Sequence, residues 1–163
     1  MEIPEQIQPF WSEFLKESAR EKTTPLHEVF YFADSESLAN SLADLVLKGV
    51  KTATSSLRWG YEAEGEHEPQ QGELCVVTNW VGTPLCVIET TEVQVKAFED
   101  VDEAFAAAEG EGDRSLAYWR EVHWAFFGRV CKDLKRDQSP QMTVVCQRFK
   151  VVFLPPTETE CHC

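Results

Sequence analysis

The stretch from Leu47 to Trp59, LKGVKTATSSLRW, brings together residue types that can carry out acid–base chemistry. Lys51 is followed closely by several hydroxyl side chains, of which Thr54 is the candidate nucleophile. A lysine is ordinarily charged, but partial burial can favour its neutral amine, which can then act as a base or activate a neighbouring hydroxyl. The structural alternative is that Lys51 neutralises the carbonyl end of a preceding helix while the threonines favour a strand. Spacing alone favours this alternative.

A second polar segment, AEGEGD at residues 108–113, alternates carboxylates with glycines. Glycines let the backbone pass close to a ligand, and a nearby carboxylate can act as acid or base, so Glu109 and Glu111 are candidate catalytic residues. We expect no cofactor. Three close carboxylates, Glu109, Glu111 and Asp113, could nevertheless bind a divalent cation. The structural alternative, which spacing alone again favours, is a glycine-broken turn with a carboxylate that caps the next helix.

The candidate substrate-binding residues lie around these two segments. Arginines beside aromatic rings suit the stacking of an unpaired base together with contact to phosphate. The candidates are Arg58, Trp59, Trp80, Arg114 and Ser115. Both tryptophans are expected beside polar residues at a strand end. Trp119 and His123 lie instead on an apolar stripe, which core packing explains.

The elements that must position these residues follow from hydrophobic periodicity. Apolar residues from Ile3 to Leu15 recur at helical spacing, and a second stripe at residues 38–46 predicts a helix that ends near Gly49. Residues 52–59 predict a strand. Alternation along it places Thr54 on one face and Ser55 on the other, the face of Lys51. Lys51 and Thr54 can converge only if the lysine lies in the preceding turn.

The rest of the chain predicts a mixed sheet. Residues 61–73 are acidic and aperiodic and predict a solvent loop, residues 73–98 predict two strands joined at 81–84, and residues 142–153 predict a late strand. Residues 100–109 and 116–130 are typical of helices. Because strands and helices do not alternate regularly, we expect an α+β fold with a mixed sheet or small barrel and not a doubly wound parallel sheet.

Composition and charge narrow the class of protein. The 163 residues, with 43% hydrophobic and 11% aromatic side chains, fit one globular domain. The sequence shows neither a signal-peptide pattern nor an apolar run of membrane-spanning length, so we expect a cytosolic protein without a membrane partner. Cys75, Cys86 and Cys146 lie in apolar runs and indicate buried thiols in a reducing compartment.

The net charge of −13 disfavours a large surface for duplex DNA, because non-specific nucleic-acid binding depends on clustered lysines and arginines. A small cleft that takes one nucleotide or a short single strand is compatible with this charge. Sequence does not predict the oligomeric state.

Residues 49–54, GVKTAT, resemble the Gly-x-Lys-x-x-Thr signature of the ASCH domain family, whose fold is similar to that of PUA domains. The resemblance continues through YFADSESLANSLADLVLKGVKTATSSLRW, PLCVIETTEV and AEGEGDRSLAYWREVHWAFF. It implies an α+β fold built on a small mixed β-barrel with helices packed around it. We therefore expect a helical segment at residues 1–28 packed on the domain, the ASCH domain at 29–154, and a flexible tail at 155–163 that contains the ECHC sequence.

The resemblance also implies functions related to RNA, because family members are assigned to RNA binding, to RNA cleavage and to amide hydrolysis of acylated cytidine. In RNA cleavage, cationic Lys51 with Arg58 or Arg114 would stabilise charge on the phosphate while a general base activates the ribose 2′-hydroxyl. Ser115 would position the phosphate. This chain resembles the RNA-cleaving members more than the shorter amidohydrolases, so cleavage of single-stranded RNA is the first expectation.

Two alternatives stay open at the level of sequence. In an amidohydrolase that acts on N4-acylated cytidine, neutral Lys51 would take the proton of Thr54, which attacks the acyl carbon, while Glu109 or Glu111 protonates the leaving amine. In a binding module without catalysis, the chain would hold RNA or a nucleoside by tryptophan stacking and a few cationic contacts.

Overall fold

The computed structural model describes residues 2–155, so the predicted tail lies, from residue 156 onward, outside the described residues. The elements in chain order are α1 (Gln8–Glu17), β1 (Glu28–Phe30), α2 (Glu36–Leu47), β2 (Ala53–Leu57), α3 (Arg58–Glu64), β3 (Leu74–Thr78), β4 (Pro84–Ala97), the 3₁₀ turn η1 (Phe98–Asp100), α4 (Glu103–Glu109), α5 (Leu116–Leu134) and β5 (Thr143–Phe153). Within the described residues, one compact unit comprises 2–47, 73–89 and 150–155, and a second comprises 48–72 and 90–149.

The described strands form a mixed sheet in the order β1-β3-β4-β5-β2. β1 is parallel to β3, whereas β3 with β4 and β2 with β5 are antiparallel. The predicted hairpin is confirmed, because β3 and β4 pair directly and their connection runs from Asn79 to Thr83. β4 and β5 each continue from one unit into the other.

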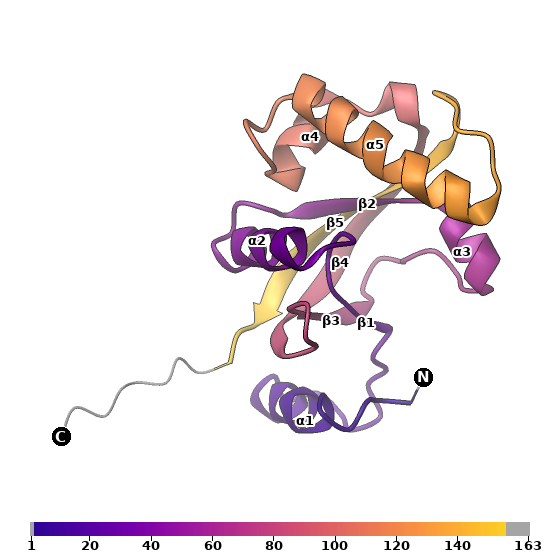
Figure 1. Ribbon diagram of the computed structural model, residues 1–163. Coiled ribbons are helices and arrows are strands. Elements are labelled where there is room, and N and C mark those ends of the chain that lie inside the picture. The colour runs from indigo at the N-terminus through magenta and orange to yellow at the C-terminus, as the bar shows by residue number, and fades with distance from the viewer. Residues whose placement is uncertain (1, 156–163) are drawn as a thin grey trace. The chain divides into compact units, whose positions relative to one another are not determined.

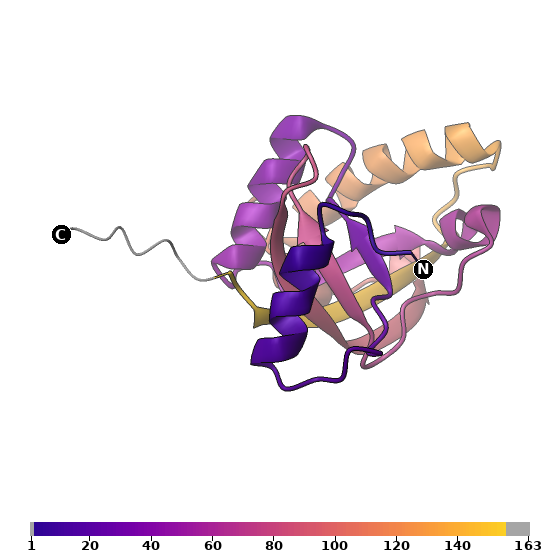
Figure 2. The same ribbon diagram turned by 90° about the horizontal axis from the view of Figure 1, so that it is seen from below.

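The first unit encloses a core of apolar side chains that α1 helps to cover. Ile7, Trp11 and Phe14 pack with Val76 and Val87 of the paired strands. Figure 2 shows α1 lying against these strands. The helix begins later than the apolar pattern predicts, because a proline occupies its first turn, where the missing N–H costs nothing.

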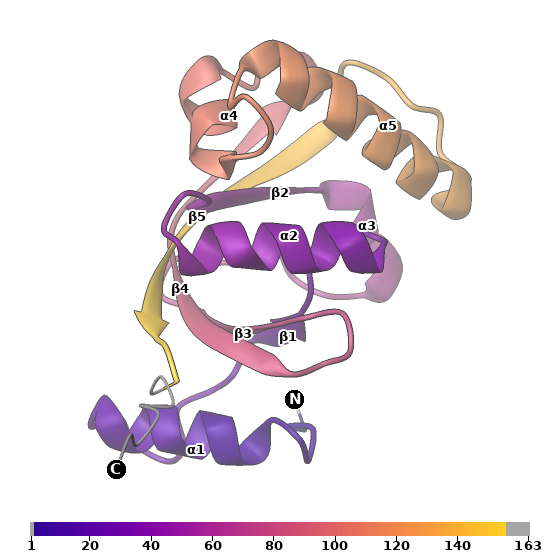
Figure 3. The same ribbon diagram turned by 60° about the vertical axis from the view of Figure 1, so that its left-hand side comes forward.

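The second unit packs α3, α4 and α5 with β2. Trp119 and Phe127 of α5 are buried with Phe105 of α4 and Leu57 of β2 in one apolar cluster. Figures 1 and 3 both show α4 and α5 together on one side of β2. This packing brings the segment before β2, the end of α4 and the inner face of α5 together.

The structure corrects the predicted strand at residues 52–59. β2 ends at Leu57, and α3 begins at Arg58 and continues into the segment predicted as an acidic loop. Gly65, in the left-handed conformation with φ 67°, ends this helix. The strand pattern extended too far because Arg58 and Trp59 have little local preference against a strand, whereas the contacts of α3 with β2 and α5 are tertiary.

The cysteines and the helices of the described residues bear on two further predictions from the sequence. Cys75, Cys86 and Cys146 are buried free thiols, as predicted. Burial raises the pKa of the Cys75 thiol to about 12, so it is an apolar core group and not a nucleophile. None of the helices in residues 2–155 has the length and apolar character needed to cross a membrane.

Candidate functional site

A buried ion pair between Lys51 and Glu109 is the centre of the candidate site. The Lys51 Nζ donates to Glu109 Oε1 at 3.0 Å and lies 3.4 Å from the Glu109 carbonyl oxygen. The two side chains are only 2% and 1% exposed. Lys51 lies two residues before β2, in the connection from α2, and Glu109 is the last residue of α4. Removing two charges from water is costly, so this pair depends on the groups around it.

The backbone holds these two segments together very closely. The Thr52 N–H donates to the Ala108 carbonyl at 2.7 Å. Gly110 ends α4 in the left-handed region with φ 71°, and a Cβ at this position would lie 2.5 Å from the Val50 carbonyl oxygen. The glycine that the sequence suggested for close backbone approach therefore approaches Val50, the residue before the lysine.

Glu109 receives hydrogen bonds from several elements of the second unit. Ser55 Oγ in β2 donates to Glu109 Oε2 at 2.7 Å, and the Trp119 indole Nε1 in α5 donates to the same oxygen. Burial would by itself raise the pKa of the Glu109 carboxyl, but the charges of Lys51 and His123 and these hydrogen bonds hold the pKa well below its usual range. Glu109 is therefore a fixed anion that accepts hydrogen bonds at both carboxylate oxygens.

Glu111 is the second carboxylate of the site and differs from Glu109 in its environment. Its Oε2 lies 3.6 Å from Lys51 Nζ and 3.7 Å from His123 Nε2. Among the described residues, this oxygen is buried and accepts no hydrogen bond. Burial raises the pKa of the Glu111 carboxyl, the Lys51 charge counteracts that shift, and the Glu109 charge adds to it. Glu111 is therefore suited to exchange a proton.

His123 completes the site, although its place on the apolar stripe of α5 led sequence reasoning to assign it to the core. The ring stacks on Trp119 at 4.3 Å between centroids, and Nε2 lies 3.3 Å from Glu109 Oε2. Burial works to lower the pKa of the imidazole, but the neighbouring carboxylates Glu109 and Glu111 raise it overall. No local pattern marks His123, because its partners come from α4 and the following turn.

Thr54 and Ser55 occupy opposite faces of β2, as alternation predicts. Ser55 faces the ion pair and donates to Glu109, whereas Thr54 is paired across the sheet with Gln147 of β5. The hydroxyl that joins the Lys51 group in this structure is therefore that of Ser55. The role of Thr54 as nucleophile stays a prediction.

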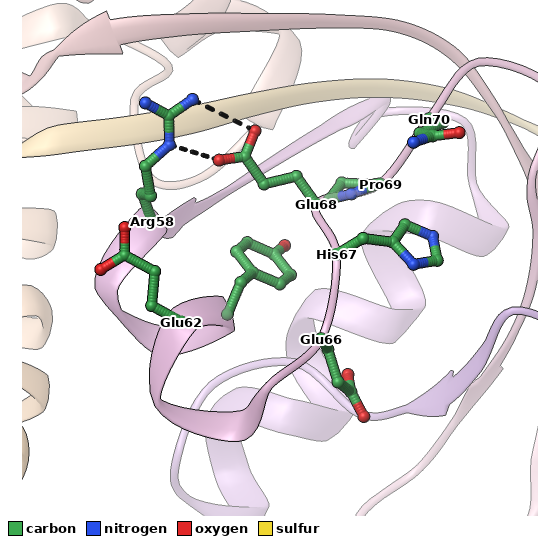
Figure 4. Close-up of a pocket in the computed structure, with 8 residues that line it drawn as sticks. Arg58, Glu62, Glu66, His67, Glu68, Pro69 and Gln70 are labelled. Carbon is green, nitrogen blue, oxygen red and sulfur yellow. Dashed lines mark hydrogen bonds and ion pairs between the residues drawn. The ribbon is translucent and has the colours of Figure 1, made fainter.

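Arg58 and Trp59, two of the predicted substrate-binding residues, lie together at the start of α3. Arg58 donates two hydrogen bonds to the Glu68 carboxylate, one from Nε and one from Nη2. This ion pair is part of the lining of a pocket of about 410 Å³ formed by α3 and the segment after it, and Figure 4 shows the Arg58 and Glu68 side chains pointing toward each other. The Trp59 ring is half-buried, with the Arg136 guanidinium 5.2 Å from its centroid.

The other three predicted substrate-binding residues, Arg114, Ser115 and Trp80, do not all belong to one unit. Arg114 is exposed in the turn after Glu111 and donates from Nε to the Ala107 carbonyl at 3.3 Å, which leaves much of its guanidinium facing solvent. Ser115 accepts a hydrogen bond from the Tyr118 N–H and so caps α5. Trp80 belongs to the first unit, where its ring lies 4.8 Å from that of Tyr31.

The site does not fit a divalent cation well. Glu109, Glu111 and His123 place one potential ligand atom each within 4.8 Å of the others. However, Glu109 Oε2 already accepts from two donors, and the Lys51 ammonium supplies a positive charge beside both carboxylates. Asp113 turns away and accepts from the Ser115 N–H. The Lys51 ammonium therefore already supplies the positive charge that a bound metal ion would bring to these carboxylates.

The fold defines one class of domain: the chain belongs to the ASCH domain family, whose profile matches residues 28–153. The solved structure of an ASCH domain from Lactobacillus crispatus JV V101 is 42% identical, with a TM-score of 0.83 over 91% of this chain and 95% of that chain. A protein of Enterococcus faecalis V583 is 35% identical, with a TM-score of 0.83 over 91% of this chain and 89% of that chain. Comparison with proteins of curated function gives no match. The predicted family and its α+β, PUA-like fold class are thus confirmed.

Proposed function

We propose that this protein binds single-stranded RNA and cleaves it with Glu111 as the general base. One observation carries the proposal: of the two carboxylates beside Lys51, Glu109 accepts hydrogen bonds at both oxygens, whereas Glu111 has a buried oxygen that accepts none among the described residues. A base must have a free lone pair and a pKa raised toward the working pH, and Glu111 meets both conditions. The RNA-related functions of the ASCH family make RNA the substrate class to test.

In the proposed reaction the Glu111 carboxylate takes the proton of a ribose 2′-hydroxyl. The 2′ oxygen then attacks the adjacent phosphorus, the bond from phosphorus to the 5′ oxygen breaks, and water protonates the leaving oxygen. Arg114, exposed in the turn directly after Glu111, is placed to contact the phosphate. Arg58 is less suited, because Glu68 already neutralises it and further glutamates line the neighbouring pocket.

The amide-hydrolysis mechanism is less compatible with this geometry. It requires a neutral Lys51 that takes a proton from Thr54. Lys51 Nζ donates to the Glu109 carboxylate at 3.0 Å, and the neighbouring hydroxyl in the hydrogen-bonded group is that of Ser55. A charged lysine can stabilise an anion but cannot act as the base.

The test is an incubation of the full chain with a short unstructured RNA, the same strand with one 2′-deoxy linkage, and N4-acetylcytidine. Products are separated by chromatography and identified by mass. We expect cleavage that spares the deoxy linkage and leaves a 2′,3′-cyclic phosphate. Glu111→Gln should slow cleavage by about 10²–10⁴-fold, the usual contribution of a general base.

Glu121→Gln is the matched control, because it makes the same chemical change at an exposed position of α5. It should cleave at the wild-type rate. Equal cleavage by the wild type and Glu111→Gln would refute the proposal and indicate a contaminating nuclease. Lys51-dependent acetate release without RNA cleavage would replace it with the amidohydrolase, and binding without either product would replace it with a binding module.

A further inference from the structure

We propose that His123 is a positioning residue that keeps Glu111 ionised by sharing a single proton with it. This inference rests on the proposed role of Glu111, and it assigns a function to a histidine that is not required to contact substrate. It starts from the geometry of the imidazole ring, which determines where its exchangeable proton can lie.

The His123 ring is fixed in one orientation. It stacks on Trp119 at 4.3 Å with 14° between the planes and packs edge-on against Phe127 at 5.6 Å. Its Nδ1 lies 2.9 Å from the Trp119 carbonyl oxygen. A carbonyl can only accept, so Nδ1 must carry a proton in both the neutral and the charged ring. Nε2 is therefore the position at which His123 gains or loses a proton.

Nε2 faces the two carboxylates. Glu109 Oε2 lies at 3.3 Å and Glu111 Oε2 at 3.7 Å. Glu109 Oε2 already accepts from Ser55 and Trp119, whereas Glu111 Oε2 has no donor among the described residues. A proton on Nε2 therefore improves the environment of Glu111 most, because it provides a positive charge beside an oxygen that has no hydrogen bond.

Charge balance limits the group to one shared proton. Four titratable side chains face one another here: Lys51 from the segment before β2, Glu109 from α4, Glu111 from the next turn and His123 from α5. The charges of Lys51 and Glu109 cancel. One proton on Glu111 and His123 together keeps the whole group neutral, whereas none or two would leave a net charge in a largely buried site, which is costly.

The shared proton gives Glu111 its role in the reaction. With the proton on Nε2, Glu111 is a carboxylate held ionised by the imidazolium and the ammonium. When the 2′-hydroxyl bond breaks, its proton bonds to Glu111 and its electron pair stays on the 2′ oxygen that attacks phosphorus. The group then gains one positive charge as negative charge develops on the phosphoryl group, which favours the transition state.

The test is a side-chain NMR titration of the histidines in the full chain, with His123 identified through its bonded resonances. We expect the Nδ1 proton to persist across the titration while Nε2 titrates. Glu111→Gln should lower the midpoint of His123 by about one pH unit or more, because a nearby opposite charge shifts a pKa by about 1–3 units. Glu121→Gln should leave it unchanged. A proton on Nε2 alone in the neutral ring, or an unchanged midpoint in Glu111→Gln, would overturn the inference.

The titration needs no RNA, so its result is independent of the proposed activity. Where cleavage is observed, His123→Gln should move the acidic limb of the rate–pH profile to higher pH with KM unchanged, because Glu111 loses the charge that keeps it ionised. A uniform loss of rate at every pH would indicate a merely structural histidine and would also overturn the inference. Coupled titration without RNA cleavage would support the shared proton while refuting the nuclease.

Discussion

Both units have an apolar interior, but only the second also buries an ion pair among its described residues. In the first unit, Ile7, Trp11 and Phe14 are buried among other apolar side chains. In the second, the largest fully buried side chains include Lys51 and Glu109. Burial of apolar surface contributes roughly 25 cal/mol per Å², whereas burial of an ion pair loses solvation that the pair recovers only with good geometry. The apolar clusters of both units are explained by stability alone, whereas the buried ion pair of the second unit points to chemistry.

The largest effect should come from breaking the buried ion pair. Lys51→Met leaves the Glu109 charge without its closest cation, and we expect it to lower the free energy of unfolding by about 3–5 kcal/mol and to abolish RNA cleavage. The double variant Lys51→Met/Glu109→Leu removes both charges and should recover part of the stability but none of the activity. Chemical denaturation of both variants measures this, and a single variant as stable as wild type would contradict it.

Truncation in the apolar interior should separate stability from activity. Phe14→Ala removes a buried ring from the first unit and should lower the free energy of unfolding by about 3–5 kcal/mol. The cleavage rate per folded molecule should match wild type, since none of the proposed catalytic groups belongs to that unit. Denaturation together with a rate corrected for the folded fraction checks this. A loss of rate in the folded protein would show that the apolar interior also supports the reaction.

Stability should depend on pH through the charged interior. The pKa of Glu109 is lowered by folding, so its contribution is present above the unfolded value of about 4.3 and is lost as pH falls below it. The pKa of His123 is raised, so its contribution is present below about 6.5 and is lost as pH rises through the folded value. Denaturation across this range should show both losses. Glu109→Gln should reduce the loss of stability at acidic pH, and an unchanged loss would reject Glu109 as its origin.

A smaller effect should distinguish the two faces of β2. Ser55→Ala removes a hydrogen bond to the buried Glu109 carboxylate and should cost about 1.5–3 kcal/mol, as expected for bonds to charged groups. Thr54→Ala removes a side chain that points away from this group and should cost less. The cleavage rate of Thr54→Ala should stay near wild type. Complete inactivation of Thr54→Ala in a folded protein would restore the threonine as nucleophile.

The smallest effect should come from the exposed ion pair of the second unit. Arg58 and Glu68 side chains are 41% and 27% exposed, so Arg58→Gln should change the free energy of unfolding by no more than about 1 kcal/mol. Its cleavage rate should also change little, whereas Arg114→Gln should weaken RNA binding. Parallel binding assays check the two arginines, and a stronger effect at Arg58 would place the RNA at the pocket beside α3.

Local patterns were enough to predict most of the elements and to suggest Lys51 as a candidate site residue. The stripe at residues 38–46 predicted α2, the apolar runs within residues 73–98 predicted the β3–β4 hairpin, and the residue types around Lys51 suggested the candidate site. The error at Arg58 arose where local preference was weak. The extent of α3 depends on packing against β2 and α5, and a pattern of neighbours along the chain does not contain that packing.

The sequence by itself determined the helices other than α3, the hairpin and the presence of a lysine between a helix end and a strand, because these depend on periodicity and on residues a few positions apart. Only the tertiary structure decided which carboxylate holds Lys51, which hydroxyl joins it and whether His123 belongs to the site. Glu109 is 58 residues from Lys51 in the chain, and the His123 ring turns toward both carboxylates only when α5 packs over the end of α4. Distances of a few ångströms between such remote residues decide pKa values, and the fold alone sets those distances.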